Sequence, residues 1–216
     1  DRAGLVGSDG ETHQGVFDLS FLTTIPNMTV ISPKNRWEMA DMLRFAMDFR
    51  HPVAIRYPRG AAYEGMRQFR APIEYGKSEV IYEEEDIAII FVGHMAELAD
   101  SVRRSLKATG YNCSLINARF VKPLDEKLLE ELAKDHELFV TIEENVITGG
   151  FGEQVMDYVS RAALDVQVRN IGISDEYVEH GNVEVLRKEV GLDRDTIVKQ
   201  AVSDYLRIME NRKKEK

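Results

Sequence analysis

The feature that most limits the possible folds is a regular alternation of apolar runs and amphipathic stretches between residues 87 and 171. One amphipathic stretch repeats Met95, Leu98, Val102 and Leu106 on a single helical face. Strands that alternate with helices predict an α/β fold with a mostly parallel sheet. The expected strands are residues 87–92, 113–117, 138–142 and 166–171, and the expected helices are residues 95–109, 125–134, 152–163, 183–190 and 194–212.

The first third of the chain follows a different pattern. Glycines crowd residues 4–15 and predict a shaped loop. Residues 60–76 lose all periodicity and read as a linker, which predicts two domains, residues 1–72 and 73–216. Between loop and linker we expect an apolar stretch at 17–22, strands at 28–31 and 53–55, and a helix at 36–49 whose apolar face is Trp37, Met39, Ala40, Leu43, Phe45, Ala46 and Phe49.

Charge and cysteine content exclude several classes of protein. The formal net charge is −9, and the one basic cluster, residues 212–216, is short and terminal, so nucleic acid is not an expected partner. No apolar run approaches the roughly 20 residues that span a bilayer. Cys113 is the only cysteine, which excludes an intrachain disulfide and fits a cytoplasmic protein. The chain opens on Asp1 without a methionine, so we expect preceding residues to be missing.

The loop between Asp9 and Gly15 contains a carboxylate and an imidazole four residues apart, at Asp9 and His13. Neighbouring glycines give the backbone the freedom to turn both side chains toward one ligand. Such a pair binds hydroxyl groups and moves protons near neutral pH. On spacing alone, an ordinary Asp-Gly turn with a solvated histidine remains an alternative.

Arg56 and Arg59 flank Tyr57-Pro58 directly after an apolar strand. Open α/β sheets bind ligands at the carboxyl ends of their strands, and an arginine fork on a stiff turn suits a phosphate or a carboxylate. Incidental surface ion pairs are the alternative.

Glu143-Glu144-Asn145 and Gly149-Gly150-Phe151-Gly152 lie between a predicted strand and a predicted helix. A dinucleotide-binding G-x-G-x-x-G motif would need a third glycine where Val155 stands, and the two glutamates would repel a pyrophosphate. We therefore interpret residues 143–152 as a tight structural turn. The sequence also has no Walker A, H-E-x-x-H or G-x-S-x-G motif.

A series of short motifs runs in order through the whole chain. They are Asp1-Arg2-Ala3-Gly4, Asp9-Gly10-x-Thr12-His13-Gln14-Gly15, Phe17-Asp18-Leu19, Ile25-Pro26, Arg56-Tyr57-Pro58-Arg59-Gly60, Lys122-Pro123-Leu124-Asp125, the run at 143–152, and Val178-Glu179-His180-Gly181. Taken together, they resemble the transketolase superfamily and, within it, the 1-deoxy-D-xylulose-5-phosphate synthases. The resemblance implies the rest of a pyrimidine-binding domain, followed by a transketolase C-terminal-like domain of three α/β layers.

The resemblance also implies an activity. Such enzymes are cytoplasmic homodimers that use thiamine diphosphate and Mg²⁺ to decarboxylate pyruvate and join the two-carbon unit to glyceraldehyde 3-phosphate, for isoprenoid synthesis. His13 would then lie near the thiazolium and assist proton transfer, and Asp9 would bind substrate hydroxyl groups. Arg2 and Arg59 would hold the phosphate, with Arg56 as the further arginine of the fork.

The sequence departs from the family in what it lacks. The G-D-G…N element that binds magnesium and diphosphate belongs to an N-terminal domain, and Gly7-Ser8-Asp9-Gly10 is not that element. The glutamate that activates the aminopyrimidine is expected upstream of Asp1. We therefore expect no metal ligand in this chain. We predict that the 216 residues fold at least in their second domain but neither bind thiamine diphosphate tightly nor turn over pyruvate.

Two alternatives remain at this point. The β subunit of a 2-oxo acid dehydrogenase carries a similar Glu-Glu-Asn…Gly-Gly-Phe-Gly stretch, although Arg56 and Arg59 suit a phosphorylated acceptor better than a lipoyl arm. A non-catalytic α/β interaction module is the other, because residues 77–216 alone contain no convincing reactive group of residues. His180 in that region is expected to be structural rather than catalytic.

Overall fold

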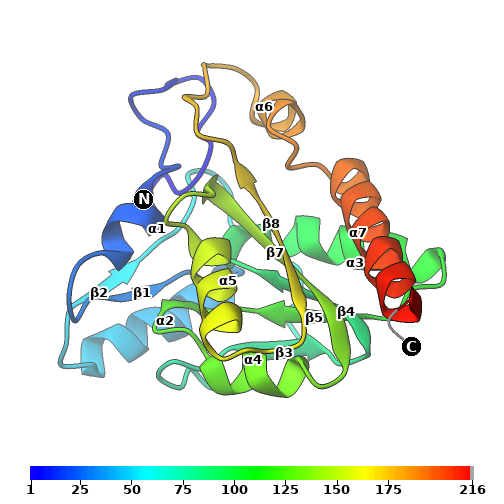
Figure 1. Cartoon of the computed structure of the whole chain (residues 1–216). Helices are drawn as coiled ribbons and strands as arrows, with labels where there is room; N and C mark the ends of the chain where they lie inside the picture. Colours follow the sequence, from blue (N-terminus) through cyan, green and yellow to red (C-terminus); the bar gives the residue numbers. More distant parts are fainter. Residues whose placement is uncertain (215–216) are drawn as a thin grey trace.

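The computed structural model describes residues 1–214, and the last two residues of the basic tail lie outside the described residues. A five-stranded sheet in the order β3-β5-β4-β7-β8 organises the fold (Figure 1). β4, β5, β7 and β8 are parallel and β3 is antiparallel, which confirms the predicted mostly parallel sheet. The strands are β3 (Glu79–Tyr82), β4 (Asp86–Phe91), β5 (Cys113–Asn117), β7 (His136–Val146) and β8 (Gln167–Ile173).

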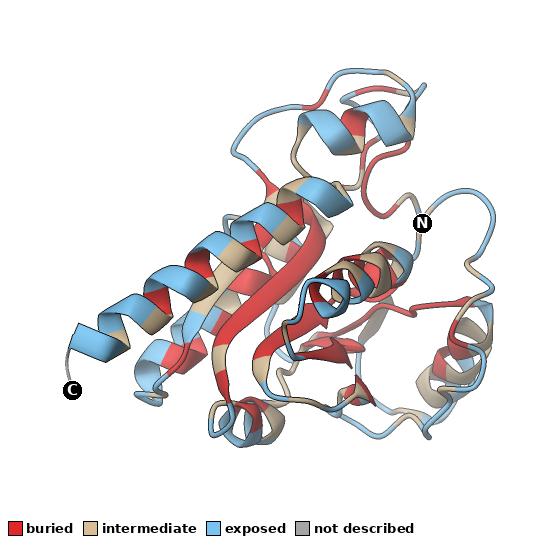
Figure 2. Cartoon of the chain, turned by 90° about the vertical axis from the view of Figure 1, so that its right-hand side faces the viewer, coloured by how far each residue is buried: buried red, intermediate tan, exposed pale blue. Residues whose placement is uncertain are grey.

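Helices cover both faces of this sheet, so that the sheet is the middle of three layers. Alternate residues of β4 enter opposite cores: Ile87 and Ile89 face one core, and Ala88 and Ile90 face the other. Figure 2 shows the sheet strands buried between the helices. The first core is covered by α3 (Ala96–Ala108) and α7 (Arg194–Lys214), and the second by α4 (Glu126–Leu132) and α5 (Phe151–Arg161).

The first region of the chain forms a smaller sheet with the order β2-β1-β6. β1 and β2 are parallel, but β6 comes from the second region and pairs antiparallel with β1, and the sequence gives no sign of it. The two predicted domains therefore share a sheet. The elements are α1 (Asp18–Thr23), β1 (Thr29–Ile31), α2 (Arg36–Asp48), β2 (Val53–Ile55) and β6 (Phe120–Lys122).

The apolar face expected for the 36–49 helix is wrong in detail. In α2 the buried residues are Glu38 and Met42, whereas Leu43 is 46% exposed. Glu38 turns inward because Lys34 Nζ and Arg119 Nε lie 2.9 and 2.8 Å from its Oε1. A buried carboxylate with two cationic partners has replaced the apolar contact that periodicity predicts.

The interpretation of residues 143–152 as a turn also needs correction. β7 continues through Val146, so Glu143, Glu144 and Asn145 are buried strand residues, and the turn is confined to residues 147–150. Beyond β8 the chain forms α6 (Val183–Glu189) before α7. Across residues 1–214, no helix combines the length and the apolar character that a membrane span requires.

Candidate functional site

The first part of the site is a loop, residues 1–15, that folds back on itself. Gly4 N donates to Gly15 O at 2.8 Å, and Gly15 N donates to Gly4 O at 2.9 Å. Ala3 N donates to Tyr57 O at 3.0 Å, which attaches the start of the loop to the turn after β2. The expected ligand-binding turn at the end of a strand thus lies beside the Asp9 loop.

Two glycines allow this close packing. Gly4 has a φ of +74°, and a Cβ atom on it would overlap the carboxylate of Glu144. A Cβ atom on Gly15 would overlap the carbonyl oxygen of Arg2. Glycine at position 4 therefore lets the loop approach Glu144 of β7, and glycine at position 15 lets the loop close on Arg2.

The loop and the turn line a polar cavity of about 590 Å³ that is open to solvent. Arg59 forms an ion pair with Asp9 across it. His13 Nδ1 lies 2.9 Å from Thr12 Oγ1, which orients the ring and leaves its Nε2 for a ligand. The cavity is lined by Asp1, Arg2, Asp9, Thr12, His13 and Arg59.

The structure therefore brings together four of the five side chains singled out in the sequence, Arg2, Asp9, His13 and Arg59. A cavity with guanidinium groups, a carboxylate and an imidazole can bind a phosphate ester, hydrogen-bond its hydroxyl groups and exchange a proton with it. Which ligand these residues bind stays a prediction.

Arg56 is not among the residues that line the cavity. Its side chain is 2% exposed, and its Nη2 donates to Gly15 O at 2.7 Å and to Glu144 O at 2.9 Å. Its Nε lies 3.4 Å from Asp18 Oδ2. The predicted role of Arg56 in substrate binding remains untested, and its burial favours a role beneath the loop.

A buried polar cluster that the sequence reading missed lies under the loop. The carboxylate of Glu144, 1% exposed, lies 2.6 Å from His94 Nε2 and 2.5 Å from Arg187 Nε, and accepts a hydrogen bond from Leu5 N at 3.2 Å. The signal that could have revealed it is a pair of glutamates continuing an apolar strand, since buried carboxylates need partners.

This cluster shifts the pKa of its members. Burial alone would raise the pKa of Glu144, but His94 and Arg187 outweigh burial and lower it to about 2. Burial lowers the pKa of His94, and the nearby Arg56 and Arg187 act in the same direction against the attraction of Glu144. Glu144 is thus the anion of the cluster.

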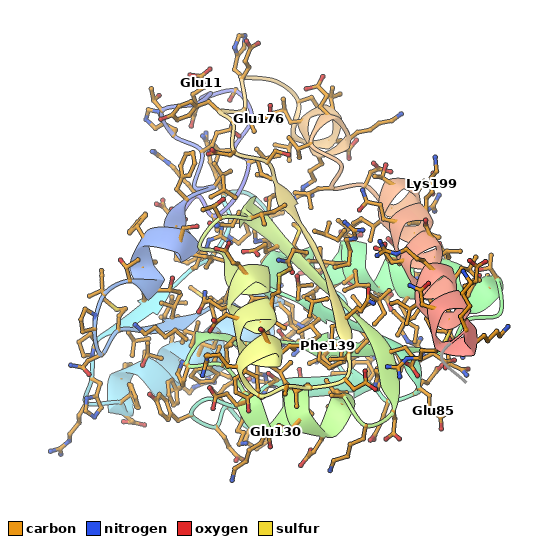
Figure 3. All side chains as sticks on the ribbon, in the orientation of Figure 1. Glu11, Glu85, Glu130, Phe139, Glu176 and Lys199 are labelled. Carbon is orange, nitrogen blue, oxygen red and sulfur yellow. The ribbon has the colours of Figure 1, made fainter. Side chains whose placement is uncertain are left out.

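Residues 178–181 support the loop from the other side. Gln14 Nε2 donates to Val178 O at 2.5 Å, and Gly181 N donates to Gly7 O at 3.2 Å. Figure 3 shows Glu11, on the loop, and Glu176, just before this segment, at the same end of the molecule. His180 is exposed and lies beside Gly10, and its expected structural role stays a prediction.

Metal-binding side chains do not cluster at this site. Among residues 1–214, no group of three or more His, Cys, Asp or Glu side chains is placed to hold a metal ion. The donors that line the cavity fit a phosphate ester and its hydroxyl groups better than a metal–diphosphate group.

Comparison with known families agrees with this architecture. The family model "Transketolase, pyrimidine binding domain" matches residues 1–64, and "Transketolase, C-terminal domain" matches residues 76–197. The chain belongs to the transketolase family.

Within this family, the sequence relatives are named as one kind of transferase. The chain is 50% identical over 199 residues to 1-deoxy-D-xylulose-5-phosphate synthase of Lachnoclostridium phytofermentans, which covers 92% of this chain and 32% of that protein. The Aquifex aeolicus synthase is 44% identical over 207 residues, 96% of this chain and 33% of that protein. The chain thus spans about a third of the length of these curated relatives.

Solved structures show the same fold. A chain described as a split gene transketolase in an inactive β4 tetramer is 27% identical, with a TM-score of 0.83, over 94% of this chain and 65% of that chain. Transketolase from Campylobacter jejuni superposes with a TM-score of 0.71 at 18% identity, over 92% of this chain and 29% of its own, which supports the fold alone.

Proposed function

We propose that this chain carries the acceptor-substrate half of an enzyme that condenses pyruvate with D-glyceraldehyde 3-phosphate. The reaction releases CO₂ and forms 1-deoxy-D-xylulose 5-phosphate, the first step of non-mevalonate isoprenoid synthesis. The observation that carries the proposal is the convergence of Arg2, Asp9, His13 and Arg59 on one cavity. The names of the sequence relatives support it.

In this proposal, Arg2 and Arg59 bind the phosphate of the acceptor. Guanidinium groups match the geometry of phosphate oxygens, and both arginines line the open cavity. Arg59 is paired with Asp9. A phosphate carries more charge than one carboxylate, so it would take over Arg59 and release Asp9.

Asp9 and His13 act on the rest of the substrate. The carboxylate of Asp9, once free of Arg59, accepts hydrogen bonds from hydroxyl groups of the acceptor. His13, oriented by Thr12, exchanges a proton through Nε2 with the oxygen of the aldehyde that becomes a hydroxyl. Thiamine diphosphate, when bound, supplies the chemistry that decarboxylates pyruvate and activates the two-carbon unit.

The groups that bind diphosphate and Mg²⁺ are proposed to lie outside this chain. The chain spans about a third of its relatives, and residues 1–214 offer no group of metal ligands. The solved split-gene relative, described as inactive, is consistent with a need for further protein. We propose that the complete enzyme is a homodimer, as the family resemblance implies, and that it is cytoplasmic, which fits the single cysteine.

Two measurements test this function. Calorimetric titration of the 216-residue chain with thiamine diphosphate and Mg²⁺ should give no binding at micromolar concentrations, and micromolar binding would contradict the proposed division of the site. The protein encoded by the complete reading frame should release CO₂ from pyruvate in the presence of glyceraldehyde 3-phosphate. Activity with a lipoyl acceptor instead would identify a 2-oxo acid dehydrogenase subunit.

A further inference from the structure

One buried residue, Glu144, is linked to both ends of the loop that carries the proposed substrate groups, directly at Leu5 and through Arg56 at Gly15. The side chain of Glu144 accepts from Leu5 N at 3.2 Å, near the beginning of the loop. Its backbone oxygen accepts from Arg56 Nη2 at 2.9 Å, and the same Nη2 donates to Gly15 O at 2.7 Å, at the end of the loop. Arg56 also leads directly into the turn that bears Arg59.

We propose, on the basis of the proposed function, that Glu144 is a positioning residue for the phosphate-binding cavity. Its carboxylate fixes the loop at Leu5, and its backbone oxygen shares Arg56 Nη2 with Gly15 O. These contacts together set the distance between Arg2 on the loop and Arg59 on the turn. Glu144 lies outside the lining of the cavity, so it acts through these segments and does not touch the substrate.

The surroundings of Glu144 explain why a carboxylate serves this purpose. His94, from the turn after β4, and Arg187, from α6, contact its oxygens at 2.6 and 2.5 Å. A buried anion paired with the Arg187 guanidinium and hydrogen-bonded to His94 holds its donors in one geometry more strongly than a neutral group would. The Leu5 amide therefore gains a strong acceptor that the loop itself does not provide.

The adjacent residue offers a matched control. Glu143 is equally buried and belongs to the same strand, but its oxygens accept from Phe151 N and Gly152 N, each at 2.8 Å, at the start of α5. Because neighbouring strand residues face opposite sides of the sheet, Glu143 lies away from the loop. Replacing either glutamate changes a buried carboxyl group, but of the two only Glu144 contacts the loop.

The test compares E144Q with E143Q in the 216-residue chain. Amide hydrogen exchange of residues 4–15, the affinity for glycerol 3-phosphate by calorimetry, and the melting temperature are measured for each. E144Q should speed exchange in the loop and weaken glycerol 3-phosphate binding by about tenfold or more, the loss of one charge-assisted hydrogen bond. E143Q should lower the melting temperature but leave loop exchange and affinity unchanged.

Arg187 provides a milder second variant, because a third of its side chain is exposed. R187M should speed loop exchange, and R187K, which keeps the charge, should restore it. Equal effects of E144Q and E143Q on loop exchange would overturn the proposal, as would unchanged exchange in E144Q. If the unmodified chain does not bind glycerol 3-phosphate, the phosphate assignment fails, and loop exchange still decides the role of Glu144.

Discussion

The first 72 residues and the region that follows them differ in how much interior each builds. The later region encloses two cores, one on each face of a five-stranded sheet. The core particular to the first region has three buried residues, Ile31, Met42 and Phe120, and Phe120 belongs to β6 of the later region. Leu19 and Val30 of the first region lie in a core made mostly by the later region.

This difference indicates which region stabilises the site. The cavity is lined entirely by residues 1–59, yet the loop rests on Glu144 and on residues 178–181 of the later region. The later region thus helps to hold the loop that carries the proposed chemistry, and none of its described residues, up to 214, lines the cavity.

Cutting the chain should produce the largest effect. Residues 76–216 retain the five-stranded sheet and should fold alone, whereas residues 1–75 lose β6 and most of their packing and should not. Circular dichroism and the dispersion of amide NMR signals of the two pieces measure this. A cooperative thermal transition in the 1–75 piece would show that the comparison is wrong.

A smaller but still large effect is expected at the buried ionic junction between the regions. Lys34, 1% exposed, contacts Glu38 at 2.9 Å and Glu79 at 2.5 Å. K34M should lower the free energy of unfolding by about 3–5 kcal/mol, because it leaves two carboxylates without one of their buried cations.

The matched control for K34M is R44M, which breaks an exposed pair with Asp41 in the same helix. Exposed pairs contribute at most about 1 kcal/mol, so R44M should change stability little. Urea unfolding of both variants makes the comparison. If K34M and R44M lowered the free energy of unfolding by similar amounts, burial of the Lys34 ion pairs would not explain their contribution to stability.

The third effect concerns pH and the later region alone. Burial raises the pKa of Glu143 to about 7, against the opposing effect of the Gly152 and Phe151 amides. Between pH 4.5 and 7 the folded chain therefore binds more protons at this residue than the unfolded chain, and stability falls as pH rises, by on the order of 3 kcal/mol. In the E143Q variant residue 143 cannot ionise, so the free energy of unfolding should change less between pH 4.5 and 7.

At lower pH, Glu144 makes the free energy of unfolding depend on pH in the opposite direction. Its folded pKa, about 2, is below the ordinary value, so its contribution is present above pH 4.5 and is lost as pH falls toward 2. Urea unfolding at a series of pH values separates the two glutamates. If the free energy of unfolding of E143Q fell between pH 4.5 and 7 as much as that of the unmodified chain, Glu143 would not be the residue responsible.

The secondary structure of the later region is easier to predict from the sequence than that of the first region, for a physical reason. Strands such as β4 and β5 are buried on both faces and read as continuous apolar runs. The three-residue strand β6 leaves no such pattern, and its partner β1 comes from a distant part of the chain. Periodicity also failed at Glu38, where buried ion pairs replaced apolar contacts.

The residues of the candidate site also differ in how well the sequence reveals them. Arg2, Asp9, His13 and Arg59 were found because their motifs are local. Glu144 was interpreted as part of a turn, since its partners Leu5, His94 and Arg187 lie 139, 50 and 43 residues away in the chain. Short-range patterns cannot reveal a cluster that only the tertiary fold assembles.

The most direct test of the central claim is a calorimetric titration of the 216-residue chain with glycerol 3-phosphate and, separately, with glycerol. We expect saturable binding of the phosphate ester alone, weakened at least about tenfold in R59M because a charged phosphate contact is lost. R161M, which removes an exposed arginine of α5 paired with Asp157, should bind as the unmodified chain does. Equal affinities for R59M and R161M would contradict the claim that this cavity is the acceptor-phosphate site.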